Sequence, residues 1–278
     1  MEYGDKHILV LGAGASGIGA SWVLAQVGAH VVLNDYKPVT LPADEEKRLV
    51  SAGVDIITGR QDESLLDGVD RIVISPGISL DIPIVKAAQA RGIDVVSEVE
   101  VAYELSKSPI VAVTGTNGKT TTTTLLTKVL EGTGKPVRVG GNIGDSLSEV
   151  AYSMPADGFL VAELSSYQLE TIKHFRPIGA IMLNITPDHL ARHKTMENYI
   201  AAKERIFENQ LSTDFMVLNI DDPIVADMKH RAPSHILEIS QHQVVSNGAY
   251  YDKGQCYVTK NGIATPVIGS ADIHIPGS

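Results

Sequence analysis

The stretch PIVAVTGTNGKTTTTTLLTKVL, residues 109–130, decides the fold of the second half of the chain. It contains an apolar run, then the loop GTNGKT at 115–120, then a threonine-rich segment of helical length. This order predicts a buried strand, a loop that can hold phosphate, and a helix. The loop is shorter than the common G-x-x-x-x-G-K-S/T loop, because Val113 stands where that loop has its first glycine.

Residues of this loop suit a nucleoside triphosphate. Glycines allow backbone N–H groups to close on phosphate oxygens, and a helix N-terminus adds positive potential. Lys119 supplies a cation for the phosphates, and the Thr120 hydroxyl can bind Mg²⁺. We therefore expect a nucleotide site of a compressed G-x-x-G-K-T form. The alternative is a Gly/Asn turn that leads into an ordinary helix.

Composition limits the class of protein. The chain has 278 residues, 44% of them hydrophobic and 20% charged, which is typical of a globular α/β chain of two domains. Its 23 Lys and Arg against 33 Asp and Glu give a net charge of −10, which argues against broad nucleic-acid or anionic-membrane binding. The lone Cys256 fits a reducing compartment. Since no apolar run reaches about 18 residues, we expect a cytoplasmic protein.

The first hundred residues alternate between strand and helix patterns. Apolar runs predict strands at 7–11, 30–33, 54–58, 71–75 and 94–97, with helices at 18–27, 44–51 and 82–91. Such alternation predicts a parallel sheet covered by helices, which is a Rossmann-like domain. Near the other end of the chain, short strands at 235–240, 249–251, 255–260 and 262–267 predict an antiparallel edge.

The turn GAGASG at 12–17 follows the first strand and has the G-x-G-x-x-G pattern. This pattern alone fits a nicotinamide or flavin dinucleotide, and it fits a UDP-sugar equally well. Asp35 would then meet a ribose or a base, unless it is a solvated carboxylate at a strand end. The turn SPGI at 75–78 should lie at the same edge of the sheet, as a ligand contact or as a plain structural turn.

Polar residues at the ends of later strands suggest a metal and substrate site. Glu163 follows the apolar run 158–162, where a carboxylate could bind Mg²⁺ together with Thr120, unless it is simply an exposed acid. Asn142 lies among glycines, and its amide can donate and accept. His189 follows another strand at 180–183, where a structural role is equally possible. Lys203, in the helical stretch 199–207, is by spacing alone a solvated charge.

Five segments in this order resemble the Mur ligases of peptidoglycan synthesis: GTNGKT at 115–120, GNIG at 141–144, ELSSYQLE at 163–170, NITPDH at 184–189 and AAK at 201–203. The resemblance runs over essentially the whole chain. With the turns at 12–17 and 75–78, segment 163–170 is most similar to the branch that adds D-glutamate to UDP-N-acetylmuramoyl-L-alanine. The resemblance implies a monomeric, cytoplasmic, ATP-dependent amide ligase of cell-wall biogenesis. Such an enzyme would contribute to cell shape, cell division and the cell cycle.

The resemblance also implies roles for individual residues. The catalytic residues would be Lys119, Glu163, His189 and Lys203. The ATP-binding residues would be Gly115, Thr116, Asn117, Gly118, Lys119, Thr120 and Thr121. The substrate-binding residues would be Gly14, Ala15, Ser16, Gly17, Asp35, Ser75, Pro76, Gly77, Asn142 and His189. Two Mg²⁺ ions would be held, one by Thr120 and Glu163, the other by His189 and a Lys203 carbamylated by CO₂.

Two domains are implied, a Rossmann-like UDP-substrate domain at 1–97 and an incomplete P-loop ATPase-type α/β central domain at 98–278. Family members continue beyond residues 274–278 with a helix at the adenine pocket and a third domain that binds the amino acid. We therefore expect a fragment that binds part of its ligands without ligase turnover, because positioning the attacking amine is a large part of the catalysis.

Two other classes remain open on the sequence alone. One is a different ligase of the same superfamily, acting on another UDP-muramoyl peptide or on folate. The other is a non-ligase Rossmann dinucleotide-binding protein, with NAD at the turn 12–17 and a regulatory ATP site at the loop 115–120. Nothing in the sequence resembles a hydride-transfer site, which weakens this second alternative.

Overall fold

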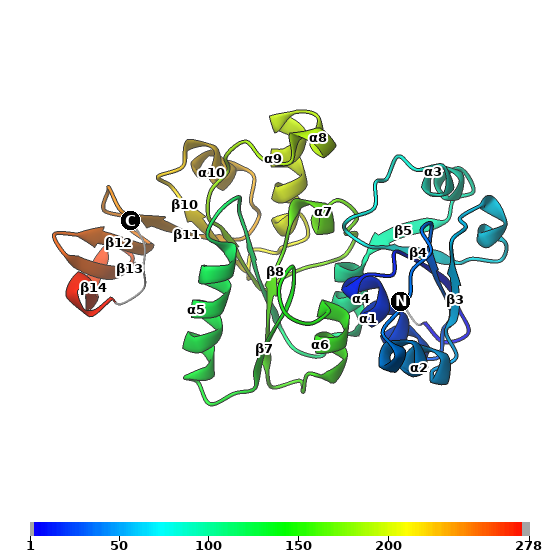
Figure 1. Cartoon of the computed structure of the whole chain (residues 1–278). Helices are drawn as coiled ribbons and strands as arrows, with labels where there is room; N and C mark the ends of the chain where they lie inside the picture. Colours follow the sequence, from blue (N-terminus) through cyan, green and yellow to red (C-terminus); the bar gives the residue numbers. More distant parts are fainter. Residues whose placement is uncertain (1–2, 274–278) are drawn as a thin grey trace.

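A computed structural model of the chain describes residues 3–273, which form two β-sheets (Figure 1). The first sheet is parallel, with strand order β3-β2-β1-β4-β5. Its strands are β1 His7–Leu11, β2 His30–Asp35, β3 Asp55–Thr58, β4 Arg71–Ile74 and β5 Asp94–Ser97. The helices of this half are α1 Ala15–Gln26, α2 Ala43–Ser51, α3 Pro83–Ala90 and α4 Glu98–Leu105, with a short 3₁₀ turn at Glu63–Leu66.

Apolar residues on both faces explain why the first sheet is covered on both sides. Along β1, Ile8 and Val10 belong to one buried cluster and Leu9 and Leu11 to another, because successive side chains of a strand point to opposite faces. Helices α1 and α2 pack on the first of these faces and α3 on the second. A continuous apolar strand is typical of a parallel sheet of this kind.

The second sheet has the strand order β14-β13-β12-β11-β10-β9-β6-β8-β7. Its strands are β6 Ile110–Thr114, β7 Val137–Gly141, β8 Phe159–Glu163, β9 Gly179–Met182, β10 Phe215–Asn219, β11 His235–Ser240, β12 Gly248–Asp252, β13 Gln255–Lys260 and β14 Ile263–Gly269. The helices are α5 Lys119–Glu131, α6 Leu147–Ser153, α7 Ser166–Leu169, α8 Leu190–His193, α9 Met196–Glu204 and α10 Pro223–Asp227, with 3₁₀ turns at Arg205–Phe207, Met228–His230 and Ser270–Asp272. The α/β fold class predicted from the sequence is thus confirmed.

Several local predictions were wrong. Segment 235–240 was expected in an antiparallel edge, but β11 pairs in parallel with both β10 and β12, and only β12 to β14 are antiparallel. Helix α1 begins at Ala15, so the second half of the turn 12–17 is helical. Helix α9 begins at Met196 and gives way to a 3₁₀ turn after Glu204.

The carboxyl ends of the parallel strands carry the residues singled out by the sequence. The loop 115–118 leaves β6, Glu163 ends β8, and the segment 183–189 leaves β9, which pairs with β6 on the other side from β8. In the first sheet, the turns after β1 and β4 leave neighbouring strands. Ligands of open α/β sheets bind at such edges, where the direction of strand order reverses.

The two sheets are joined at α1, α4 and α6. Glu98, at the start of α4, is fully buried, and its Oε1 accepts hydrogen bonds from the Ser146 hydroxyl at 2.6 Å and the Ser148 N–H at 2.7 Å. Burial raises the pKa of Glu98. Arg48 of α2 pairs with Glu149 of α6 at 2.7 Å.

A domain boundary after residue 97 stays a prediction, and the predicted truncation point at 274–278 lies outside the described residues.

Within residues 3–273, none of the helices is both long and apolar enough to cross a membrane.

Gly19 of α1 faces Ser146 before α6 and offers a test of how the two sheets are joined. A Cβ atom at Gly19 would lie 2.2 Å from Ser146 Oγ and 2.3 Å from Ser146 Cβ. Helix propensity alone favours Gly19→Ala by about 1 kcal/mol, whereas overpacking costs about 1–3 kcal/mol. We expect a net loss of stability in urea denaturation. Gly4→Ala, which adds a methyl group in open space, is the control. A Gly19→Ala chain as stable as the control would contradict this packing.

Candidate functional site

The loop 115–118 is pressed against the segment that follows β9. Gly115 has a φ of +146°, and a Cβ atom there would lie 2.9 Å from Leu183 Cβ and 3.3 Å from the Asn184 nitrogen. Gly118, the residue before α5, has a φ of +84°, which is left-handed backbone. Both glycines predicted for close backbone approach therefore occupy positions where another residue would be strained.

Hydrogen bonds fasten the loop to the same segment. The N–H groups of Thr116 and Asn117 donate to the Asn184 carbonyl at 2.9 Å and to its side-chain oxygen at 2.8 Å. The Thr116 hydroxyl accepts from the Thr186 N–H at 3.0 Å and lies 3.0 Å from the Tyr199 hydroxyl. The sequence segments 115–120 and 184–189 are thus one structural unit, which their separation along the chain concealed.

Two lysine ammonium groups share one carbonyl of this loop. The Gly115 oxygen accepts from Lys119 Nζ at 3.1 Å and from Lys203 Nζ at 2.7 Å. Lys119 also donates to the Thr116 carbonyl at 2.9 Å, so its side chain folds back over the loop. In this position the Lys119 ammonium lies close to the start of α5, whose first N–H groups have no partner within the helix.

Lys203 lies beneath the loop, with 2% of its surface exposed. Its ammonium also donates to the Thr114 hydroxyl at 3.3 Å and lies 5.0 Å from the centre of the Tyr199 ring. Burial, with a contribution from the nearby Lys119 charge, lowers the pKa of Lys203 from its ordinary 10.5 to about 7, although Asp188 acts in the opposite direction. The interpretation of Lys203 as a solvated charge is therefore wrong.

Glu163 is also buried, with 1% of its surface exposed, and is not the exposed acid that its position alone allowed. Its Oε1 accepts from the Asn142 side chain at 2.9 Å, and its Oε2 has no hydrogen-bond partner among the described residues. The absence of a side chain at Gly141 lets the backbone before Asn142 lie against the backbone of Glu163, because a Cβ at Gly141 would lie 2.4 Å from the Glu163 carbonyl oxygen. A buried carboxylate oxygen without a partner is costly, and a bound cation would relieve that cost. Thr120, the second predicted ligand, is exposed on the first turn of α5, which packs on β8.

Aromatic rings surround the histidines. His189, in left-handed backbone before α8, has a half-exposed side chain 3.4 Å from Asp188 Oδ2, and its ring centre is 4.9 Å from that of Tyr167. His193 is buried, bonded to the Ser166 hydroxyl at 2.8 Å, and burial lowers its pKa. Both histidine rings also contact Tyr199. Sequence reasoning missed Tyr167 and Tyr199, although Tyr199 precedes Lys203 by one helical turn.

In the first sheet, the two predicted turns touch. The Ser75 hydroxyl lies 3.3 Å from the Gly12 carbonyl, and a Cβ at Gly12 would meet Ser75 at 2.8 Å. Asp35 Oδ2 accepts from the Ala13 N–H at 3.0 Å, so this carboxylate is tied to the glycine turn and is not simply solvated. The predicted substrate residues of this sheet lie around the contact: Gly14, Ala15, Ser16 and Gly17 on the turn and first turn of α1, and Ser75, Pro76 and Gly77 after β4.

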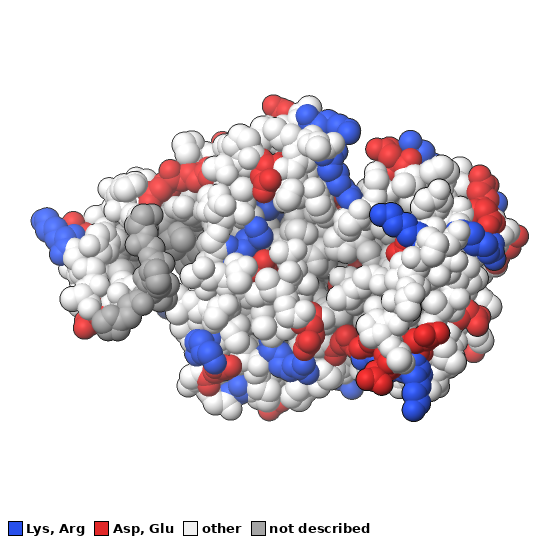
Figure 2. All heavy atoms as spheres, in the orientation of Figure 1, with Lys and Arg blue, Asp and Glu red and all other residues white. Residues whose placement is uncertain are grey.

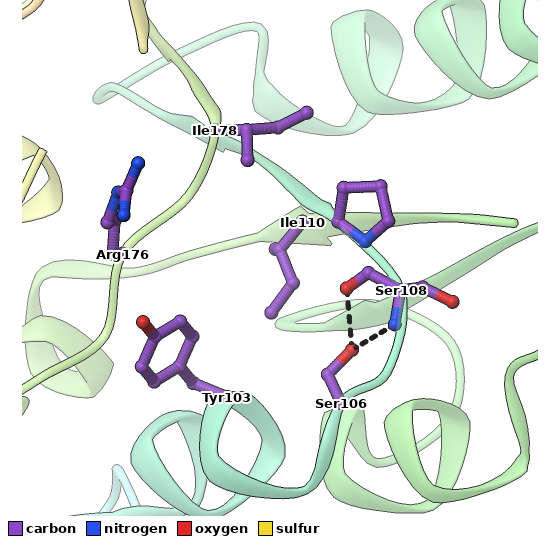
Figure 3. Close-up of a pocket in the computed structure, with 7 residues that line it drawn as sticks. Tyr103, Ser106, Ser108, Ile110, Arg176 and Ile178 are labelled. Atoms are coloured by element: carbon purple, nitrogen blue, oxygen red, sulfur yellow. Dashed lines mark hydrogen bonds between the residues drawn. The ribbon is translucent and has the colours of Figure 1, made fainter. Parts of the chain in front are cut away.

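A cavity of about 190 Å³ lies elsewhere. Its walls include Tyr103 and Arg176 on one side and Ser106 and Ser108, bonded to each other, on the other (Figure 3). It opens beside Ile110, the first residue of β6, whereas the phosphate loop leaves the last residue of that strand. It is therefore separate from the candidate site. Among residues 3–273, no three His, Cys, Asp or Glu side chains are grouped to hold a metal ion, so the two Mg²⁺ sites stay predictions.

A phosphate loop at the carboxyl edge of a parallel sheet, after a Rossmann-like sheet, defines a P-loop ATPase-type α/β architecture. Residues 113–277 match the family described as Mur ligase middle domain, and residues 6–97 match Mur ligase MurD-like, N-terminal domain. The chain belongs to the Mur ligase family.

Two curated relatives, both described as UDP-N-acetylmuramoylalanine--D-glutamate ligase, show the extent of the match. The protein of Thermoanaerobacter sp. (strain X514) is 45% identical over 277 residues, which is 100% of this chain and 61% of that relative. The protein of Halalkalibacterium halodurans is 42% identical over 99% of this chain and 60% of its own length. The chain thus spans about 61% of the length of the first of these relatives.

Solved structures support the fold. The Neisseria meningitides UDP-N-acetylmuramate:L-alanyl-gamma-D-glutamyl-meso-diaminopimelate ligase has a TM-score of 0.62 and 20% identity, with 94% of this chain and 86% of that chain covered. The murein peptide ligase of Psychrobacter arcticus has a TM-score of 0.56 and 19% identity, with 94% and 60% covered. At these identities the likeness concerns architecture alone.

The depressed pKa of Lys203 predicts a pH effect on stability. The unfolded chain keeps this ammonium protonated up to the ordinary pKa of 10.5, whereas the folded chain releases the proton near pH 7. Between these values the unfolded state binds more protons, so the Lys203 contribution favours folding increasingly as pH rises, by up to about 1.4 kcal/mol per pH unit. Burial of the protonated Lys203 side chain destabilises the folded state, and this free-energy cost is fully present below pH 7.

We expect the difference in unfolding free energy between wild type and Lys203→Met to shift in favour of wild type from pH 7 to 9.5. Urea denaturation in buffer free of carbon dioxide would measure it. Lys128→Met, which removes an exposed ammonium, should follow the wild-type profile. Parallel profiles for wild type and Lys203→Met would contradict the buried state of Lys203.

Proposed function

We propose that the chain supplies the UDP-substrate and ATP-binding parts of an ATP-dependent ligase that joins D-glutamate to UDP-N-acetylmuramoyl-L-alanine. We place this reaction in the cytoplasm, as a step of peptidoglycan precursor synthesis by a monomeric enzyme. The observation that carries the proposal is the convergence of Lys119, Lys203 and Glu163 on the phosphate-loop edge of the second sheet. The family matches and the names of the relatives support it.

ATP would bind with its phosphates along residues Gly115, Thr116, Asn117, Gly118, Lys119, Thr120 and Thr121. The first N–H groups of α5 have no partner within the helix and would favour an anion, and the Lys119 ammonium would exchange its carbonyl partners for phosphate oxygens. Thr120 and the unpartnered oxygen of Glu163 fit a Mg²⁺ ion, since both are oxygen donors suited to a hard cation. Such an ion supplies neutralisation of phosphate charge.

Lys203 is suited to carbamylation by CO₂. The reaction needs the neutral amine, and a pKa of about 7 leaves a large fraction of Lys203 in that form at neutral pH. The amine nitrogen would bond to the carbon of CO₂ and release one proton, which converts a buried cation into an anion with two oxygens. With His189, this carbamate would provide oxygen and nitrogen donors for a second Mg²⁺.

The chemistry of the residues then accounts for amide formation. A carboxylate is a poor electrophile, so the alanyl carboxylate would attack the γ-phosphoryl group of ATP and give an acyl phosphate and ADP. Lys119 would offset the repulsion between these two anions. The D-glutamate amine would attack the acyl carbon, and phosphate would leave from the tetrahedral intermediate. Asn142 and His189 would hold the muramoyl part, while the turns at 12–17 and 75–77 with Asp35 would hold the UDP end.

We assign D-glutamate to none of the described residues. We therefore propose that the 278 residues alone bind UDP-N-acetylmuramoyl-L-alanine and ATP without sustained amide formation. Capture and orientation of the amine account for a large part of the barrier reduction in reactions of this kind. Normal ATP-dependent amide formation by this chain would contradict this part of the proposal.

Isothermal titration separates the proposed function from its rivals. We expect the chain to bind UDP-N-acetylmuramoyl-L-alanine and not NAD. We also expect Lys119→Ala to weaken ADP·Mg²⁺ binding about 10- to 100-fold, because a hydrogen bond to a charged group contributes about 1.5–3 kcal/mol. Lys128→Ala, on the exposed side of the same helix, is the matched control. Binding of NAD alone would overturn the ligase proposal in favour of a dinucleotide-binding protein.

A further inference from the structure

Arg192 connects the two sheets at their carboxyl edges. It lies on α8, three residues after His189, and its Nη1 donates to the Pro76 carbonyl oxygen at 2.9 Å. Pro76 belongs to the turn after β4, which touches Gly12 through Ser75. One side chain of the second half of the chain therefore holds the turn of the first sheet on which we place the UDP end of the substrate.

The guanidinium is held rigidly from the side of the second sheet. Both oxygens of Glu170 accept hydrogen bonds from it, and its carbon lies 4.4 Å from the centre of the Tyr167 ring. The Arg192 and Glu170 side chains are only 19% and 15% exposed. Glu170 also lies 3.4 Å from His193 Nδ1. A planar group that is both paired and stacked loses little further freedom when it donates to Pro76.

This contact has a different place from the rest of the junction. The packing of α1 and α4 against α6 joins the sheets through Gly19, Glu98 and Ser146, beyond the ends of β1, β5 and β7, whereas Arg192 joins the segment after β9 to the turn after β4. In Figure 2 the outline of the molecule has a notch between the region of α8 and α9 and the region of α3. Arg192 links α8 to the turn after β4, and so constrains the span between the two edges.

We propose that Arg192 is a positioning residue, which sets the distance between the two substrate-binding edges and so the affinity for a UDP-sugar that bears a carboxylate and touches both. The inference rests on the proposed function. A ligand that binds at both edges makes its second contact while it is already bound at the first. Its affinity therefore depends on how well the distance between the two edges is fixed. The turn after β4 is also held within the first sheet, where the Ser75 N–H donates to the Leu11 carbonyl at 2.9 Å and the Ile78 N–H to the Ser75 carbonyl at 3.0 Å. Binding of UDP at the first sheet, or of ADP·Mg²⁺ at the second, should therefore not depend on Arg192.

Titration of three ligands into Arg192→Ala tests this. We expect the affinity for UDP-N-acetylmuramoyl-L-alanine to fall roughly 10- to 100-fold, within the usual range of coupling between sites, and the affinities for UDP and ADP·Mg²⁺ to stay within twofold, or about 0.4 kcal/mol. Arg192→Lys keeps the charge but loses the planar fork, so it should show a smaller loss with the same selectivity, and it serves if Arg192→Ala is poorly folded. Arg91→Ala, an exposed arginine paired with Glu63 and Asp67, is the control.

The outcomes separate the inference from the proposed function. Unchanged binding of UDP-N-acetylmuramoyl-L-alanine by Arg192→Ala would overturn the inference alone. An equal loss for all three ligands would also overturn it, since that pattern indicates a general structural role. If wild type binds UDP-N-acetylmuramoyl-L-alanine no more tightly than UDP, no ligand spans the two edges, and both the inference and the proposed function fail.

Discussion

The candidate site depends on one shared set of hydrogen bonds, in which Lys119 and Lys203 both donate to the Gly115 carbonyl oxygen. It requires the loop to lie against Leu183 with no room for a side chain at position 115. The same closeness lets Asn184 and Thr186 fasten the loop by hydrogen bonds. Contacts within the chain thus fix the loop, and such fixing reduces the conformational entropy lost on binding.

The electrostatics of the site follow from this packing. Burial of Lys203 near the charge of Lys119 makes its ammonium form costly, while Glu163 keeps one oxygen without a partner in the part of the chain that the structure describes. Buried ionisable groups with a shifted pKa, such as Lys203, are common at sites that bind charged ligands. An anionic nucleotide with its cation, and a modification that reverses the charge of Lys203, would relieve both costs. This is the physical basis of the proposed ATP site.

Much of this arrangement could be predicted from the sequence, because apolar runs and glycine turns report directly on local structure. The bounds of β1, β5 and β13 were predicted correctly, and the strand, loop and helix predicted at 109–130 are present as β6, the loop 115–118 and α5. Segment 98–105, EVEVAYEL, was not predicted as a helix, because its residues alternate as in a strand. Glu98 and Glu100 are buried there, since N–H groups of Ser148 and of residues 173–175 donate to them.

The burial of Lys203 and the contact of Arg192 with Pro76 could not be predicted from residue spacing, although the family resemblance pointed to Lys203 as a site residue. Charged side chains on helices are mostly solvated, and only the tertiary structure shows that one lies beneath the phosphate loop and that the other reaches Pro76. These contacts join residues 88 and 116 positions apart. Patterns of three to four residues carry no information about such distances.

Hydrogen–deuterium exchange with and without ADP·Mg²⁺ tests the central claim, that the loop fastened to the β9 edge is the nucleotide site. The account predicts slower exchange at the amides of 118–121, because those N–H groups would face phosphate. Smaller changes are expected at residues 116, 117, 185 and 186, whose N–H groups already donate within the chain. Protection confined to the glycine turn at 12–17, with the loop 115–121 unaffected, would contradict it.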